Sequence, residues 1–157
     1  MRVLGIDPGT KALGWAVVEQ NGRSLSAIDS GVFSPPKGEL APRLLEINRF
    51  AGGLIERFSP DTIALEAAFY QKNIATTLRL GEVRAAVVIA AAQRVIPVKD
   101  LEPRVVKKSV TGNGAATKAQ VVYMVQKLLS IPSCPSVDQS DALALAICLI
   151  NRTKRTL

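Results

Sequence analysis

The sequence predicts an α/β fold, a mixed five-stranded sheet with helices on both faces. Strand-like and helix-like segments follow one another in the order βββ-α-β-α-β-α-α-α. Of the 157 residues, 48% are hydrophobic, which is enough to fill a core between such layers. No internal repeat, low-complexity stretch or linker divides the chain. We therefore expect residues 1–157 to form one domain, with a basic C-terminal tail at about residues 151–157.

The first half of the chain predicts three strands and a helix. Short β-type runs occupy residues 2–7, 13–19 and 24–33. Asn21-Gly22 is a tight-turn signal between the second and third runs, so the three predict an antiparallel meander. Residues 34–38 predict a loop, and apolar residues then recur at helical spacing over residues 41–58. Gly52-Gly53 weakens that helix without excluding it.

The second half predicts two further strands and four further helices. Short apolar runs at residues 62–66 and 95–101 predict the strands. Helical patterns cover residues 73–93, 103–110, 117–130 and the segment from Asp138 onward. A Gly-containing turn at residues 111–114 separates two of these helices.

Charge and cysteine content indicate the class of partner and the cell compartment. The net charge of +7 and pI near 9.8 are typical of a protein with a polyanionic partner, nucleic acid first and an anionic membrane surface second. The chain begins without a signal-peptide pattern, and its longest apolar runs are well short of the roughly 18 residues of a membrane span. We expect a cytoplasmic protein without a membrane segment, in which Cys134 and Cys148 stay reduced.

The sequence contains no histidine, which excludes several kinds of site. A Ser-His-Asp triad, a Cys-His protease, an HExxH zinc site and a C₂H₂ finger all need imidazole. Acid, base and metal chemistry must therefore come from carboxylates, lysines, hydroxyls and backbone groups.

Four acidic residues stand at the edge of predicted core segments. Asp7 ends the first strand, Glu66 ends the fourth, and Asp138 and Asp141 open the last helix three residues apart, on one face. Taken singly, each has a structural explanation as a turn residue, ion-pair partner or helix cap. If the first and fourth strands are neighbours, however, Asp7 and Glu66 meet at one sheet edge. Such carboxylates repel unless a cation is bound, and hard oxygen ligands favour Mg²⁺ or Mn²⁺, so a basic protein with this pattern suggests a nuclease.

Four motifs in order resemble the RuvC family of Holliday junction resolvases. They are GIDPGT, Glu66 followed by Ala67-Ala68-Phe69, GNGAATKAQV, and DQSDALALAI near the C-terminus. The resemblance implies an RNase H-like fold, a homodimer and symmetric nicking of four-way DNA junctions. It also implies catalysis by Asp7, Glu66, Asp138 and Asp141 with two Mg²⁺ or Mn²⁺ ions, products with a 5′-phosphate and a 3′-hydroxyl, and partnership with the branch-migration proteins RuvA and RuvB.

Candidate DNA contacts lie in two segments. Lys107, Lys108 and Lys118 flank the turn at Gly112, Asn113 and Gly114, where lysines and backbone amides could approach phosphates. Surface lysines beside an ordinary loop are the alternative, but the resemblance favours Lys107 and Lys118 as residues near the active site. Phe69, Tyr70 and Lys72 follow the fourth strand, and Phe69 matches an aromatic residue proposed to stack on an unpaired base.

Three other functions are compatible with part of the pattern. A different RNase H-like nuclease, acting on RNA–DNA hybrids or structured RNA, would share the carboxylates. An actin-like or sugar-kinase phosphotransferase would share GIDPGT but needs a second domain, for which 157 residues are too few. A non-catalytic architectural DNA binder would explain the charge but not the four acids.

Overall fold

The computed structural model describes residues 1–67, 73–133 and 136–154. Its elements follow the predicted order, with bounds β1 Arg2–Pro8, β2 Leu13–Asn21, β3 Ser24–Phe33, α1 Leu40–Phe58, β4 Thr62–Glu66, α2 Ile74–Ala92, β5 Val98–Leu101, α3 Pro103–Thr111, α4 Lys118–Leu129 and α5 Val137–Lys154. None of the helices in these three segments is long and apolar enough to span a bilayer.

The five strands form one mixed sheet in the order β3-β2-β1-β4-β5. β1, β2 and β3 are the predicted antiparallel meander, whereas β4 runs parallel to both β1 and β5. The condition under which Asp7 and Glu66 would meet is fulfilled: the first and fourth strands are neighbours, and Ile6 of β1 pairs with Leu65 of β4. The carboxyl ends of these two strands therefore lie side by side.

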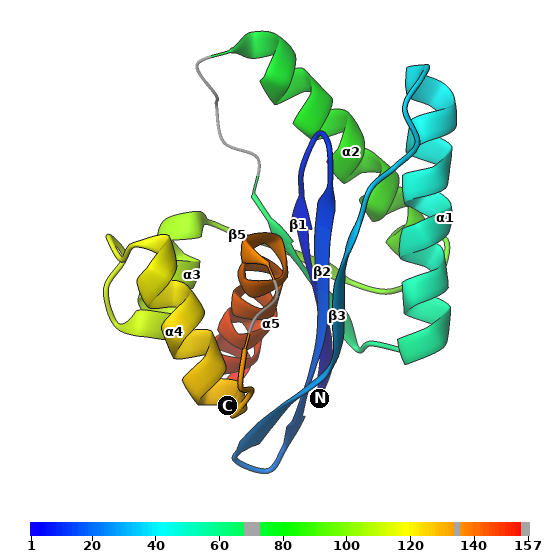
Figure 1. Cartoon of the computed structure of the whole chain (residues 1–157). Helices are drawn as coiled ribbons and strands as arrows, with labels where there is room; N and C mark the ends of the chain where they lie inside the picture. The colour runs from blue at the N-terminus through cyan, green and yellow to red at the C-terminus, as the bar shows by residue number, and fades with distance from the viewer. Residues whose placement is uncertain (68–72, 134–135, 155–157) are drawn as a thin grey trace.

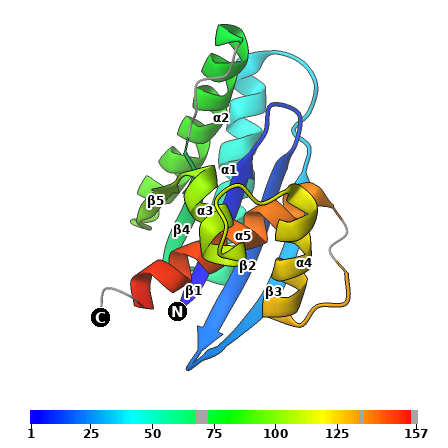
Figure 2. The same cartoon turned by 90° about the vertical axis from the view of Figure 1, so that its left-hand side faces the viewer.

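Helices cover both faces of the sheet, as predicted (Figure 1). α1 and α2 lie on one face, while α5 lies directly on the other, between the sheet and the outer helices α3 and α4 (Figure 2). Side chains of β1 alternate between the layers, as the two-residue period of a strand requires: Val3 packs with α5, whereas Leu4 and Ile6 pack with α1 and α2.

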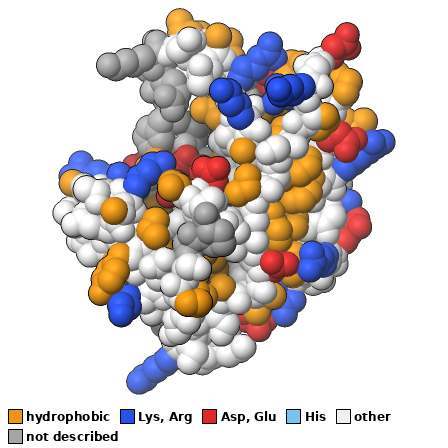
Figure 3. Space-filling view, in the orientation of Figure 1, with side chains coloured by type: hydrophobic (Ala, Val, Ile, Leu, Met, Phe, Trp, Pro, Cys, Tyr) orange, Lys and Arg blue, Asp and Glu red, His pale blue; other side chains and the backbone are white. Residues whose placement is uncertain are grey.

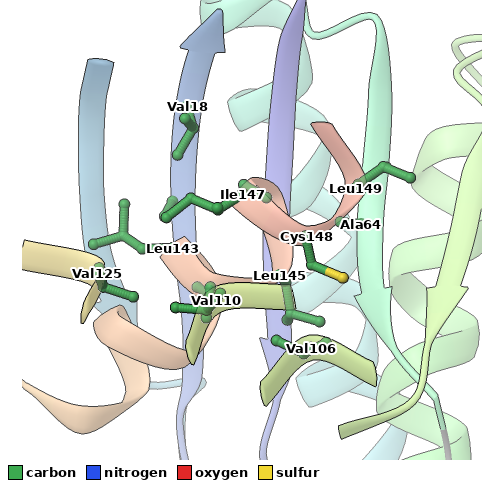
Figure 4. Packing of buried hydrophobic residues seen from close by; sticks show 14 of the residues in the cluster. Val18, Ala64, Val106, Val110, Val125, Leu143, Leu145, Ile147, Cys148 and Leu149 are labelled. Atoms are coloured by element: carbon green, nitrogen blue, oxygen red, sulfur yellow. The ribbon is translucent and has the colours of Figure 1, made fainter. Parts of the chain in front are cut away.

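The core on the α5 face is built from small and branched aliphatic side chains. Leu143 and Ile147 of α5 lie toward the strands, and Val106 and Val110 of α3 cover the opposite side of the helix (Figure 4). Cys148 is a buried free thiol in this core. Cys134 lies outside the described residues.

Two segment boundaries differ from the prediction by more than two residues. The fifth strand begins at Val98 rather than at residue 95, because α2 ends in a turn in which the amide of Val95 donates to the Ala92 carbonyl. Val95 is exposed there with a φ of 57°, which no strand residue adopts. At the C-terminus, residues 151–154 continue α5 instead of fraying, and the side chain of Thr153 bonds the Leu149 carbonyl at 3.0 Å.

α1 continues through Gly52, where it is contacted by the end of α2. A Cβ atom at Gly52 would overlap the guanidinium of Arg94, which crosses from the end of α2 to bond Glu56 at 2.6 Å. The absence of a side chain at Gly52 thus lets α1 and α2 be tied together.

Candidate active site

Two carboxylates meet at the carboxyl ends of β1 and β4. Ile6 of β1 pairs with Leu65 of β4. Asp7 follows Ile6 and Glu66 follows Leu65, so strand pairing alone places the two acids next to each other. The two carboxyl groups interact across this edge, and the charge of Glu66 raises the pKa of Asp7. Asp7 is therefore held in a position where its charge competes directly with that of Glu66.

The N-terminal part of α5 brings Asp138 and Asp141 to the same place, and two glycines allow its close approach. A Cβ atom on Gly5 of β1 would overlap the carbonyl oxygen of Ala142, and one on Gly14 of β2 would overlap the backbone of Asp138. Any other residue at these positions would push the helix away from the sheet. The first glycine of GIDPGT, Gly5, thus serves helix packing in this fold.

The electrostatics of the site reflect four acids in a confined space. Burial, reinforced by the charges of Glu66, Asp141 and Asp138, raises the pKa of Asp7 to about 8. Burial also raises the pKa of Glu66 and of Asp141. Lys118 counters part of both shifts, and Arg84 counters part of the shift of Glu66. Full ionisation of the cluster is unfavourable without a compensating cation.

This arrangement fits a hard divalent cation, although it is not a preformed cage. Across residues 1–67, 73–133 and 136–154, no group of three or more acidic or cysteine side chains is set at metal-binding spacing. The donors are all carboxylate oxygens, however, and the raised pKa of Asp7 shows that its negative charge is unfavourable there without a neighbouring positive charge. A bound cation would relieve the repulsion that raises these pKa values.

Basic side chains lie beside the acids. Lys118 opens α4, whose first turn is fixed by a capping box between Thr117 and Gln120, and its Nζ atom lies 3.4 Å from Asp141. The charge of Lys107 on α3 also counters a small part of the rise in the pKa of Asp141. Lys108 is exposed. In the space-filling view, acidic side chains gather near the middle of the visible face, with blue Lys and Arg side chains beside them (Figure 3).

The turn between α3 and α4 is more strongly tied into the protein than the sequence suggested. Gly112 caps α3 with a φ of 82°, and its amide donates to the Lys108 carbonyl, so this amide is not available to a phosphate in the structure. The side chain of Asn113 accepts a hydrogen bond from the amide of Ala115. A hollow of about 410 Å³ lies beside this turn, lined by Asn113, Gln120, Tyr123 and neighbours but by none of the four acids.

Sequence reasoning missed one basic residue in this region. Arg104 is exposed at the start of α3, and its side chain lies against Gly114, where a Cβ atom would overlap it. The spacing of Arg104 to Lys107 and Lys108, three and four residues in a helix, was the signal that could have found it. Phe69, Tyr70 and Lys72 lie outside the described residues.

Comparison with known proteins identifies the family. The sequence matches the family described as crossover junction endodeoxyribonuclease RuvC over residues 3–149. The protein of that name from Maricaulis maris is 44% identical over 157 residues, covering 99% of this chain and 94% of its own. The one from Aliivibrio salmonicida is 41% identical over 152 residues, covering 97% and 88%.

Solved structures agree with the sequence comparison. The RuvC of T. thermophilus in complex with Holliday junction substrate superposes with a TM-score of 0.93 at 29% identity, covering 99% of this chain and 96% of that one. The yeast mitochondrial Holliday junction resolvase shares the fold, with a TM-score of 0.71 at 16% identity over 98% of this chain and 80% of that one. The predicted RNase H-like fold is confirmed. The chain therefore belongs to the RuvC family of crossover junction endodeoxyribonucleases.

Proposed function

We propose that this protein is a metal-dependent, structure-selective endonuclease that resolves Holliday junctions by paired symmetric nicks in homologous recombination and DNA repair. The products are a 5′-phosphate and a 3′-hydroxyl at each nick, which can be ligated directly. The observation that carries the proposal is the convergence of Asp7, Glu66, Asp138 and Asp141 in a chain of net charge +7. Acids at the centre suit cations, while a basic surface suits DNA.

We expect Asp7, Glu66, Asp138 and Asp141 to hold Mg²⁺, with Mn²⁺ as a substitute, as two ions. Bound divalent cations would supply charge neutralisation, polarisation of the scissile phosphate and a more acidic attacking water. The ends of β1 and β4 and the start of α5 fix the positions of the carboxylate oxygens. They would therefore also fix where bound cations, and the scissile phosphate that contacts them, lie. Imidazole plays no part, because the chain contains no histidine.

The basic side chains are proposed to receive the DNA backbone. Lys118 pairs with Asp141 in this structure, and we expect it to turn to a phosphate once a cation takes over the carboxylate. Lys107, Lys108 and the turn at 112–114 would extend this surface along α3. From the family resemblance we also propose contacts by Phe69, Tyr70 and Lys72, with Phe69 stacking on an unpaired base.

We propose that the protein is a homodimer, because paired nicks on opposing strands need two active sites. α2 supports this: Ile74 and Leu78 are 63% and 64% exposed, and the small or apolar residues Gly81, Ala85, Val88 and Ala92 continue the same helical stripe. Two copies of this stripe would bury each other's apolar surface. RuvA and RuvB are proposed as branch-migration partners, and the cytoplasm as the location.

Purified protein is expected to nick a synthetic four-way junction with Mg²⁺ and to leave linear duplex and RNA–DNA hybrid almost intact. The four motifs motivate the junction preference, since they match the resolvase family over most of the chain. The measurement is single-turnover cleavage of the three substrates, with ligation of the products as the test of end chemistry. Faster cleavage of the hybrid would instead assign the site to an RNA-directed nuclease.

The Mg²⁺ concentration for half-maximal nicking is expected to fall as pH rises toward about 8. The pKa of Asp7 is about 8 without metal, so at neutral pH a cation must displace a proton from this site. Each displaced proton makes the apparent affinity about tenfold higher per pH unit, up to the pKa. Mg²⁺ titrations of single-turnover nicking between about pH 6 and pH 9 test this. A half-saturation point that does not move with pH would contradict it.

Leu78→Arg is expected to produce a folded monomer that no longer makes paired nicks. The exposed stripe on α2 would carry a charge at one of its two large, strongly exposed aliphatic residues, which opposes burial against a second copy. Sedimentation or size-exclusion chromatography with light scattering measures the change. Leu45→Arg is the matched control, since Leu45 is a leucine of α1 that is 48% exposed and lies outside the stripe. A dimeric Leu78→Arg variant would remove α2 as the interface.

A further inference from the structure

Arg84 is a largely buried arginine that no catalytic assignment uses. It lies on α2 with its side chain only 12% exposed, and it reaches two acceptors at the carboxyl edge of the sheet. Its Nη1 atom donates to the backbone carbonyl of Glu66, and its Nη2 atom bonds the Asp100 carboxylate at 2.8 Å. Arg84 therefore joins α2, the last residue of β4 and strand β5 through one planar group.

The bond is made to the backbone of Glu66, which leaves the carboxylate free. Glu66 is the last residue of β4, and the next residue, Ala67, extends the ladder through its amide, which donates to the Leu101 carbonyl at 2.9 Å. A strand end of this kind can splay or twist unless its last carbonyl is held. Bonding the carbonyl fixes the direction in which the side chain leaves the strand, and no carboxylate oxygen is consumed.

A second arginine makes the corresponding contact beside β1. Arg43 of α1 donates from Nη2 to the carbonyl of Thr10 at 2.8 Å, in the turn three residues after Asp7. Its Nε atom is buried with no hydrogen-bond partner in the described part of the chain. Burying a guanidinium that is only partly satisfied costs stability, so packing alone does not explain its place.

We infer that Arg84 and Arg43 are positioning residues, which hold the ends of β4 and β1 so that Glu66 and Asp7 keep the geometry needed for cleavage. Both come from the helix layer on the far side of the sheet from α5, so the four acids are held from two sides. Neither side chain needs to touch DNA or metal. The inference rests on the proposed function, since it concerns how the proposed catalytic carboxylates are aimed.

The experiment compares Arg84→Met and Arg43→Met with the wild type in single-turnover nicking, with junction affinity measured separately without divalent metal. Methionine keeps most of the aliphatic stem and removes every donor. We expect a fall in nicking rate of about 10- to 100-fold for Arg84→Met, and a rise in half-saturating Mg²⁺, with junction affinity within about twofold. Arg84→Lys should recover part of the rate that Arg84→Met loses, because the single lysine nitrogen can donate to one of the two acceptors of Arg84. Arg43→Met is expected to act in the same direction.

Arg94→Met is the matched control. Arg94 also lies at α2 and bonds one carboxylate, Glu56, and one backbone carbonyl, Ala90, but neither acceptor is near the acids. It should lose stability without losing rate below the melting temperature. A wild-type rate in Arg84→Met, or a loss equal to that in Arg94→Met, overturns the inference for Arg84. For Arg43, the inference is overturned if Arg43→Met has a wild-type rate or loses no more rate than Arg94→Met.

Two further variants keep the outcome interpretable. If Arg84→Met does not fold, Asp100→Ala is the alternative. It removes only the carboxylate that Arg84 bonds on β5, and the side chain of Asp100 is 58% exposed. This variant is expected to slow nicking by about two- to fivefold. An unchanged rate in that variant also overturns the inference for Arg84. Asp7→Asn separates this inference from the proposed function: an active Asp7→Asn enzyme refutes the metal site itself, whereas an inactive one beside a fully active Arg84→Met refutes only the role of Arg84.

Discussion

Asp7→Asn is expected to slow nicking by on the order of 10³-fold or more while junction binding is retained. Burial and the charges of Glu66, Asp141 and Asp138 all act on the Asp7 carboxylate, so its replacement removes a charge that a bound cation would need. The amide fills nearly the same volume and disturbs no packing. Single-turnover nicking and gel-shift affinity, both with the four-way junction, measure the two effects.

The same substitution is expected to stabilise the protein when no metal is present. The pKa of Asp7 is raised from 3.8 to about 8 on folding, so the native state binds more protons and its stability falls as pH rises between these values. Asparagine removes this loss, which is up to about 5 kcal/mol at pH 8 because each pKa unit is worth about 1.4 kcal/mol, so the variant should melt several degrees above the wild type. Thermal melts in EDTA at about pH 5 and pH 8 test the sign, because the gain should shrink at the lower pH.

Asp61→Asn provides the control for both effects. Asp61 precedes β4 at the opposite end of the strand, where its Oδ2 atom accepts from the amide of Arg2 at 2.7 Å. Its replacement should leave nicking unchanged. Substantial nicking by Asp7→Asn, or a metal-free melting temperature below that of the wild type at pH 8, would count against the assignment of Asp7 as the central, charge-strained ligand.

Local sequence patterns were sufficient to predict the carboxylates. Asp7 and Glu66 each end an apolar run, and a three-residue spacing in a helix gives Asp138 and Asp141 a common face. One tertiary assumption, the pairing of β1 with β4, then brings the first two together, and that pairing is confirmed. The convergence of these acids was predictable because they stand at element ends, where the change from apolar to charged residues is abrupt.

The parts that depend on contacts distant in sequence were not predictable. Arg84 bonds a carbonyl that lies 18 residues earlier in the chain, and nothing in its local sequence distinguishes it from Arg79, which pairs with Glu82 on the helix surface. Gly14 likewise looks like an ordinary strand residue, and its role appears only once α5 lies across β2. Propensity and periodicity describe single elements, whereas these residues act where two elements meet.

Gly14→Ala is expected to lower the nicking rate by on the order of 10²-fold, because it displaces the helix that carries two of the four acids. Gly14 pairs with Asp7 across β1 and β2, and a Cβ atom there would overlap the carbonyl of Asp138. The added methyl group must push the start of α5 away from the sheet, at a cost of about 1–3 kcal/mol in stability. Half-saturating Mg²⁺ should rise, while affinity for the junction without metal should change little.

Two control variants separate displacement of the acids from loss of stability. Gly53→Ala adds the same methyl group to α1 where no atom lies within 4 Å, so it should be neutral or slightly stabilising and fully active. Val125→Ala removes buried volume from α4 and should destabilise the fold to a similar degree without moving α5 against β2. If Gly14→Ala and Val125→Ala lose equal activity at a temperature where both are folded, Gly14 serves only stability. If Gly14→Ala alone loses activity and needs more Mg²⁺, close approach of α5 to the sheet is what sets the geometry of the carboxylates.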